Sequence, residues 1–205
     1  VGLSSSGTSS YDNEYNSGIG SNGLTSARHD VLSQYIKEKY PESYDNNLPI
    51  KLSYCGSKNL TDKLDGFNID IGKMLLSPTR SYAPLLKLIF DEIGRNKING
   101  IIHCTGGGQT KILHFIDNLH ILKNNLFEIP PIFKLIMNES NTDPKEMYKV
   151  FNMGHRMEIY LDPENASKVI DISKSVGIDA KIIGEVIESD NKKLSIQSEL
   201  GNFDY

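Results

Sequence analysis

The order of apolar and polar residues predicts helices and strands that alternate along most of the chain. The clearest helix is expected over residues 82–93, where apolar residues recur every three or four positions and Gly94 follows the last of them. Pro84 falls in its first turn, where a missing N–H costs little. Further helices are expected over residues 24–36, 69–76, 111–117, 131–137, 144 onward and 163–176.

Strands are predicted where apolar residues form a short run or alternate with polar ones. Residues 98–104 form a run typical of a buried strand. Between residues 157 and 161, apolar positions alternate with Glu158 and Tyr160, which predicts a half-buried strand. Residues 180–187 are a third predicted strand, and residues 51–54 are a candidate for a short one.

This alternation assigns the chain to the α/β (α+β) class, with a mixed β-sheet flanked by helices. The expected layout begins with a glycine- and serine-rich arm or loop at residues 1–23. An α/β domain follows at residues 24–188, and residues 189–205 form a polar C-terminal tail or a last strand.

Composition and charge narrow the class of protein. The 205 residues are 38% hydrophobic and 23% charged with a net charge of −4. This suits one globular domain, or one domain with long arms, and argues against a large nucleic-acid interface. No apolar run approaches the roughly 20 residues that span a bilayer, so no membrane association is expected. Cys55 and Cys104 form neither a disulfide framework nor a zinc spacing, which favours a reduced, cytoplasmic protein. The start at Val1, without Met or a basic leader, favours a piece of a larger protein.

The first candidate site is a glycine-rich turn before a helix. Residues 18–23 match G-x-G-x-x-G, but no buried strand precedes them, so a dinucleotide site is rejected. Ser21, Asn22 and Gly23 lie at the predicted helix start, where free N–H groups favour an anion. Arg28, within the first two turns, could add a bidentate phosphate contact. The alternative is a plain helix cap followed by a surface Arg.

The second candidate follows the strand that ends at His103. Thr105 is followed by Gly106, Gly107 and Gly108, whose backbone N–H groups can approach a ligand closely. The loop lacks the Lys-Ser/Thr of a Walker A motif and is not by itself an ATP site. His103 is a candidate proton donor or hydrogen-bond orienter, or else a core histidine.

The third candidate is the polar interruption just before the strand at residue 157. Asn152, His155 and Arg156 could line a cleft at the strand start, and the alternative is a turn with a surface Arg. No group of carboxylates stands out as a magnesium site, so no metal ligand is predicted.

Taken in order, these segments resemble the C-terminal half of the aminoimidazole ribonucleotide synthetase family. The resemblance rests on residues 20–28, 103–108, 151–154 and 183–186, with the proline-rich helix start at residues 130–133. Residues 22–29 and 154–156 resemble the branch found in Bacteroidetes-type bacteria.

The resemblance implies the ATP-dependent cyclisation of formylglycinamidine ribonucleotide to aminoimidazole ribonucleotide in purine synthesis. In the family, ATP and Mg²⁺ are held mainly by an N-terminal domain that also forms a homodimer, and this chain would supply the substrate side. The isolated chain would then be inactive. The implied catalytic residue is His103, and the implied substrate and phosphate ligands are Ser21, Asn22, Gly23, Ser26, Arg28, Thr105, Gly106, Gly107, Gly108, Asn152, Gly154, His155 and Arg156.

Two other interpretations remain open from the sequence. One is another ATP-using member of the superfamily, of the formylglycinamidine ribonucleotide synthetase or selenophosphate synthetase type. The other is a non-catalytic binding domain of the same fold, which would need neither Arg28 nor the loop at residues 106–108.

Overall fold

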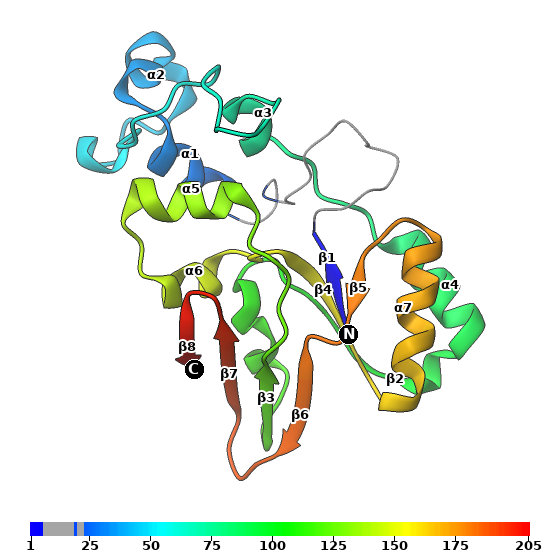
Figure 1. Cartoon of the computed structure of the whole chain (residues 1–205). Coiled ribbons are helices and arrows are strands. Elements are labelled where there is room, and N and C mark those ends of the chain that lie inside the picture. The colour runs from blue at the N-terminus through cyan, green and yellow to red at the C-terminus, as the bar shows by residue number, and fades with distance from the viewer. Residues whose placement is uncertain (6–18, 20–22) are drawn as a thin grey trace.

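In the computed structural model, which describes residues 1–5, 19 and 23–205, the strands form two four-stranded sheets (Figure 1). The first sheet has the order β2 (Ile98–His103), β4 (His155–Leu161), β1 (Gly2–Ser4) and β5 (Ala180–Lys181). Every neighbouring pair in it is antiparallel. A strand from the start of the chain therefore lies between strands from its second half.

The second sheet stands beside the first and contains one parallel pair. Its order is β6 (Gly184–Glu188), β3 (Leu119–Lys123), β7 (Lys193–Ser198) and β8 (Gly201–Asp204), and only β3 and β7 run parallel. The prediction of a mixed α/β fold with flanking helices is confirmed. The strands are divided between two sheets, whereas one sheet was expected from the sequence.

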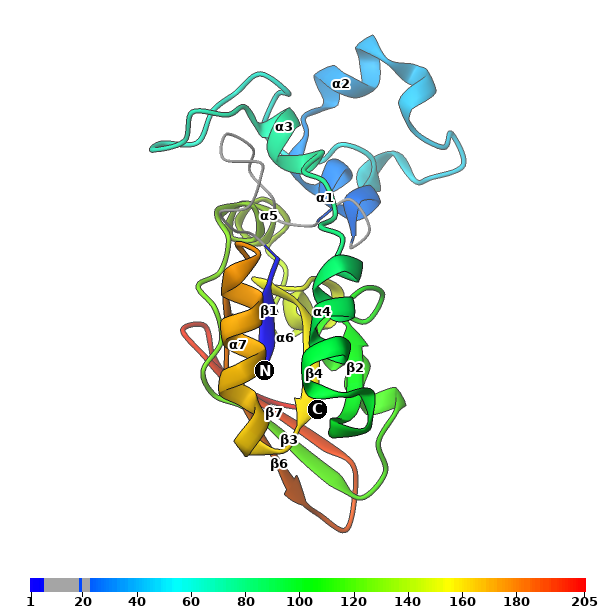
Figure 2. The same cartoon turned by 90° about the vertical axis from the view of Figure 1, so that its right-hand side faces the viewer.

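Two helices cover the outer face of the first sheet. These are α4 (Ala83–Ile93) and α7 (Ala166–Ser175), which lie side by side across its strands (Figure 2). Ile89 of α4 and Val169 of α7 are fully buried against Ile159 of β4, because each helix presents one apolar stripe to the sheet. The predicted boundaries of α4 are confirmed to within a residue, with Gly94 at φ 93° after its end.

The remaining helices gather beyond one end of the sheets (Figure 1). They are α1 (Leu24–Val31), α2 (Gln34–Lys39), α3 (Ile71–Leu75), α5 (Pro131–Ser140) and α6 (Pro144–Val150). Short 3-10 helices occur at Pro41–Ser43, Ile50–Leu52, Arg95–Lys97, Gly108–His114 and Pro163–Asn165. None of the helices in the described residues is long and apolar enough to cross a membrane.

Several predicted elements differ from the structure for local reasons. The helix expected over residues 24–36 is split into α1 and α2, because Leu32 is extended and forms a bridge with Lys58. Residues 50–52 form a 3-10 helix where a short strand was proposed, and residues 108–114 form another where an α-helix was predicted. The strand expected over residues 180–187 is broken into β5 and β6, which belong to different sheets.

Residues near both ends of the chain form strands where the sequence predicted an arm or loop and a polar tail or last strand. Gly2–Ser4 was placed in an arm or loop, yet it is a buried strand whose Leu3 is fully enclosed in the core. The tail from residue 189 contains two strands, since Leu194 and Ile196 alternate with polar residues and point into the core. The strand β3 was not predicted at all.

Candidate functional site

The two predicted glycine turns meet at one aromatic residue. A Cβ atom added to Gly23 would lie 2.5 Å from the Phe151 ring. A Cβ atom added to Gly108 would lie 2.6 Å from the carbonyl oxygens of Phe151 and Tyr148. The start of α1 and the loop after β2 are therefore neighbours, although more than 80 residues separate them in the sequence.

The glycine loop presents unused backbone donors. Gly106, Gly107 and Gly108 have φ angles of 54°, 101° and 47°, a left-handed run that side chains disfavour. The N–H groups of Gly106 and Gly107 donate no hydrogen bond to any residue that the structure describes. Lys111 brings a positive charge to the loop, because its Nζ donates to the Thr105 carbonyl oxygen at 2.7 Å. Successive free N–H groups of this kind form an anion-binding concavity.

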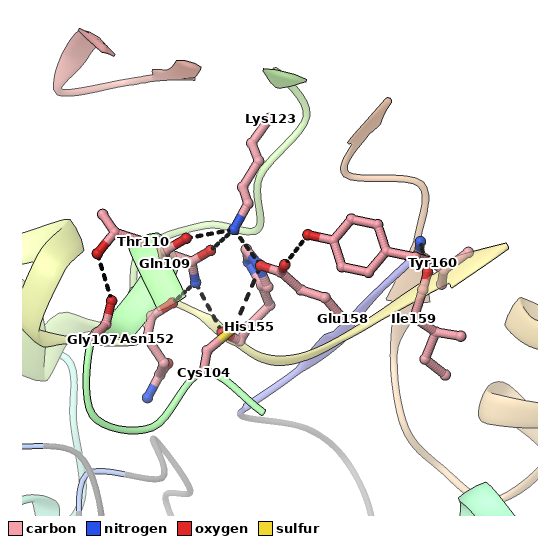
Figure 3. Close-up of polar contacts among 11 residues, drawn as sticks. Cys104, Gly107, Gln109, Thr110, Lys123, Asn152, His155, Glu158, Ile159 and Tyr160 are labelled. Carbon is pink, nitrogen blue, oxygen red and sulfur yellow. Dashed lines mark hydrogen bonds and ion pairs between the residues drawn. The ribbon is translucent and has the colours of Figure 1, made fainter. Parts of the chain in front are cut away.

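Gln109 joins this loop to the turn before β4. Its Nε2 donates to the carbonyl oxygens of Asn152 and His155, the latter at 3.1 Å (Figure 3). Within that turn, the Gly154 N–H donates to Asn152 Oδ1 at 3.0 Å. The glycine loop and the turn before β4, which were the second and third candidate segments, are therefore held together by the buried Gln109 side chain.

A buried charge network lies directly behind Gln109. The Lys123 ammonium donates to Gln109 O at 2.8 Å and to its Oε1 at 2.9 Å, and it forms an ion pair with Glu158. Glu158 also accepts hydrogen bonds from Tyr160 and His155 (Figure 3). Burial opposes the ionisation of Glu158, but Lys123 and His155 outweigh it and hold the pKa of this carboxyl well below its usual range.

Three side chains of this network have the chemistry of metal ligands. The ligand atoms of Cys104, His155 and Glu158 lie within 4.8 Å of one another. However, the Lys123 ammonium already occupies the same carboxylate, and burial followed by the Glu158 charge raises the pKa of the Cys104 thiol, whereas metal binding requires a thiolate. In this cluster the Lys123 ammonium therefore occupies the position that a metal ion would need.

Arg156 is fully buried and fixes the protonation of His103. Its Nε donates to His103 Nε2 at 3.1 Å, which requires that nitrogen to be unprotonated. Burial, reinforced by the charges of Arg156 and Lys111, lowers the pKa of His103. His103 is thus neutral at pH 7 and suited to orient Arg156. The alternative that Arg156 is a surface residue is wrong.

The structure does not join every predicted ligand to this cluster. Ser26 is exposed, and its Oγ donates to Asp30 at 2.9 Å. The side chain of Arg28 is half-buried and forms neither a hydrogen bond nor a salt bridge with the described residues. Ser21 and Asn22 lie outside the described residues. The roles of these four residues stay predictions.

The residues that hold the loop in place were not predicted from the sequence. Lys123 lies on β3, which was not predicted. Gln109 follows the three glycines, where a Walker A motif would have its Lys, and no role was predicted for it. Glu158 alternates with apolar residues and so resembled the polar side of a half-buried strand. In fact β4 is buried on both faces from His155 to Ile159. The sequence alone carried no signal for this, because one Glu between apolar residues is equally typical of a strand with an exposed face.

A separate cavity of about 790 Å³ lies between the two sheets. Its walls are mainly apolar side chains of β2, β3, β4 and β6, and Lys123 and Glu158 also line it. None of the predicted ligands lines it. Lys123 and Glu158 therefore border this cavity, and Lys123 also contacts Gln109 next to the glycine loop.

We expect the fold to lose stability as the pH falls from about 7.5 to 5.5. Burial lowers the pKa of His29, His103 and His155 from 6.5, so the unfolded chain binds protons that the folded chain does not. Urea denaturation at several pH values measures this. His155→Gln should reduce the slope, and His114→Gln, at an exposed position, is the matched control. A flat stability profile over this pH range would contradict the prediction.

Comparison with known proteins identifies relatives over most of the chain. The family model described as "AIR synthase related protein, C-terminal domain" matches residues 53–197. A phosphoribosylformylglycinamidine cyclo-ligase from Methanococcus vannielii is 37% identical over 170 residues, which cover 83% of this chain and 42% of the relative. A protein of the same name from Syntrophus aciditrophicus is 30% identical over 189 residues, covering 87% of this chain and 47% of the relative. The chain thus spans less than half the length of these relatives.

Proposed function

This chain belongs to the family of AIR synthase related proteins, C-terminal domain, and we propose that it forms the ribonucleotide-binding part of an ATP-dependent cyclo-ligase. The family predicted from the sequence is confirmed. The Bacteroidetes-type branch stays a prediction. The names of the curated relatives support a ligase role in purine biosynthesis.

The proposed reaction closes the imidazole ring of aminoimidazole ribonucleotide. ATP phosphorylates the formyl amide oxygen of formylglycinamidine ribonucleotide, an internal amine attacks the activated carbon, and phosphate leaves. Negative charge on phosphoryl oxygens persists through both stages, so fixed N–H donors and cations are the expected stabilisers.

One observation carries the proposed role of this chain. The free N–H groups of Gly106 and Gly107 lie on a loop that shares the neighbour Phe151 with Gly23, at the start of α1. In the proposal these two sets of donors hold the substrate phosphate, and Lys111 adds charge attraction. Gln109, Lys123 and Glu158 keep the loop rigid from behind, so that little order is lost on binding.

The residues described around the loop do not fit a magnesium ion. The nearby carboxylate, Glu158, is already bound to Lys123, His155 and Tyr160. We therefore assign Mg²⁺, most contacts to ATP and the homodimer interface to the part of the relatives that this chain does not match. On this proposal the chain alone binds the ribonucleotide and does not turn it over.

The proposal predicts that substrate binding by this chain depends on the phosphate. In an NMR titration of the ¹⁵N-labelled chain, formylglycinamidine ribonucleotide should shift the amide signals of Gly106 and Gly107. The riboside without its phosphate should bind about tenfold or more weakly, because charge-assisted hydrogen bonds are lost. Equal affinity for the two compounds, or unchanged Gly106 and Gly107 signals at saturation, would contradict the proposed site.

A further inference from the structure

A buried arginine outside the site described above lacks the partners that its charge requires. Arg80, just before α4, is only 6% exposed. Its Nε and Nη2 are buried without a hydrogen-bond partner, and its Nη1 makes one long contact of 3.4 Å with the Gly177 carbonyl oxygen. No salt bridge to Arg80 is formed anywhere in residues 1–5, 19 and 23–205.

An unpaired buried guanidinium lowers the stability of the folded protein when no ligand is bound. A guanidinium cannot lose its proton at physiological pH, so burial does not neutralise it. A buried charge without a partner is strongly destabilising, whereas a buried charge with a well-placed anion is tolerated. The two free nitrogens, Nε and Nη2, form one edge of the guanidinium, and this edge binds two oxygens of a phosphate or carboxylate in parallel.

Tyr82 connects Arg80 to the candidate site. Its hydroxyl donates to the Ser4 carbonyl oxygen at 2.7 Å, and its ring lies edge-on to His103 with 6.1 Å between the ring centroids. Burial raises the pKa of Tyr82, and the charges of Arg80 and Arg156 both oppose the rise. Tyr82 therefore links the segment that carries Arg80 to His103, which accepts the hydrogen bond from Arg156.

We propose that Arg80 is an anion-binding residue and that its free guanidinium edge binds a phosphate group beside His103 and Arg156. This inference deepens the proposed function, because a ribonucleotide cyclo-ligase handles both a substrate phosphate and a phosphate product. The ligand chemistry is a phosphate dianion, either free or as a monoester. No local pattern singles out Arg80, which follows Pro78 and Thr79 in a connecting segment.

The competing explanation is purely structural. Gly177 follows the C-terminal end of α7, where the helix dipole attracts cations, so Arg80 could serve only to cap that helix. This explanation accounts for one of the three guanidinium nitrogens. It predicts that removing the charge lowers stability, whereas an anion-binding Arg80 predicts the opposite sign in the absence of ligand.

The test compares the thermal midpoint of the wild-type chain and of Arg80→Met with and without inorganic phosphate. We expect Arg80→Met to be as stable as wild type or more stable in phosphate-free buffer, and to lose the rise in Tm that phosphate gives wild type. Arg95→Met, at an exposed position, is the matched control and should keep that rise. A lower Tm for Arg80→Met together with an intact phosphate effect would overturn the proposal.

A second variant covers the case in which Arg80→Met does not fold. Arg80→Lys keeps the charge but loses the forked edge, so its Kd for phosphate should rise about tenfold or more. An unchanged Kd would overturn the proposal. Formylglycinamidine ribonucleotide is then added to wild type in competition with phosphate. Displacement identifies the monoester as the ligand, whereas phosphate binding that depends on Arg80 but resists displacement supports the anion site and contradicts the proposed substrate.

Discussion

Lys123→Met is expected to lower the free energy of unfolding by about 3–5 kcal/mol. The ammonium of Lys123 is the cation that keeps Glu158 ionised in a site where both side chains are at most 2% exposed. Met has a similar length but no charge, so Glu158 would be left buried with only neutral donors. The Gln109 carbonyl and side-chain oxygens would lose a donor as well, and the glycine loop would lose its support.

Urea denaturation followed by circular dichroism measures the loss of stability. Two comparisons test whether this loss comes from the buried ion pair. Lys87→Met removes an exposed i,i+4 partner of Asp91 and should cost only about 0.3–0.5 kcal/mol. In the double variant Lys123→Met/Glu158→Gln, the second change should restore part of the lost stability, because it removes the unpaired charge. Strictly additive losses would show that the pair is not coupled as described.

Gly108→Ala is expected to damage both the fold and phosphate binding. An Ala at φ 47° is strained by about 1–2 kcal/mol, and its Cβ would meet two carbonyl oxygens at 2.6 Å. The backbone of the loop or of residues 148–151 must then move, which adds about 1–3 kcal/mol. Because the Gly106 and Gly107 N–H groups depend on this geometry, the affinity for the ribonucleotide should fall by about tenfold or more.

Gly106→Ala is the matched control for this prediction. Gly106 has a similar φ of 54°, but no atom lies within 4 Å of an added Cβ. The variant should therefore show the backbone strain of about 1–2 kcal/mol without the steric contact. Equal losses of stability in the two variants, measured by chemical denaturation, would mean that the close approach to Phe151 and Tyr148 does not matter.

The parts of the fold that could be predicted are those with strong local signals. The stripe of residues 82–93 with Gly94 after it specifies α4, and Asp143 before Pro144 specifies the start of α6, where its side chain accepts from the Lys145 N–H. The glycine loop was identified for the same reason, since three adjacent glycines suit a left-handed run. These features depend on residues within a few positions of one another.

The missed features depend on partners far away in the sequence. Three residues, Gly2–Ser4, carry no strand signal of their own and become a strand only between β4 and β5. Glu158 could not be assigned to the interior without knowing that Lys123 faces it from the second sheet. Arg80 likewise shows its unsatisfied nitrogens only in three dimensions. A single sequence does not encode these pairings in any local pattern.

The place of β1 also fixes the order in which the first sheet can be completed. On the ribosome, Gly2–Ser4 emerges long before its two neighbours in the sheet, which lie at residues 155–158 and 180–181. The nascent chain must therefore keep this segment unpaired until residue 181 has been made. Closure over so long a loop is slow relative to helix formation, so the docking of β1 is expected to be a late event in folding.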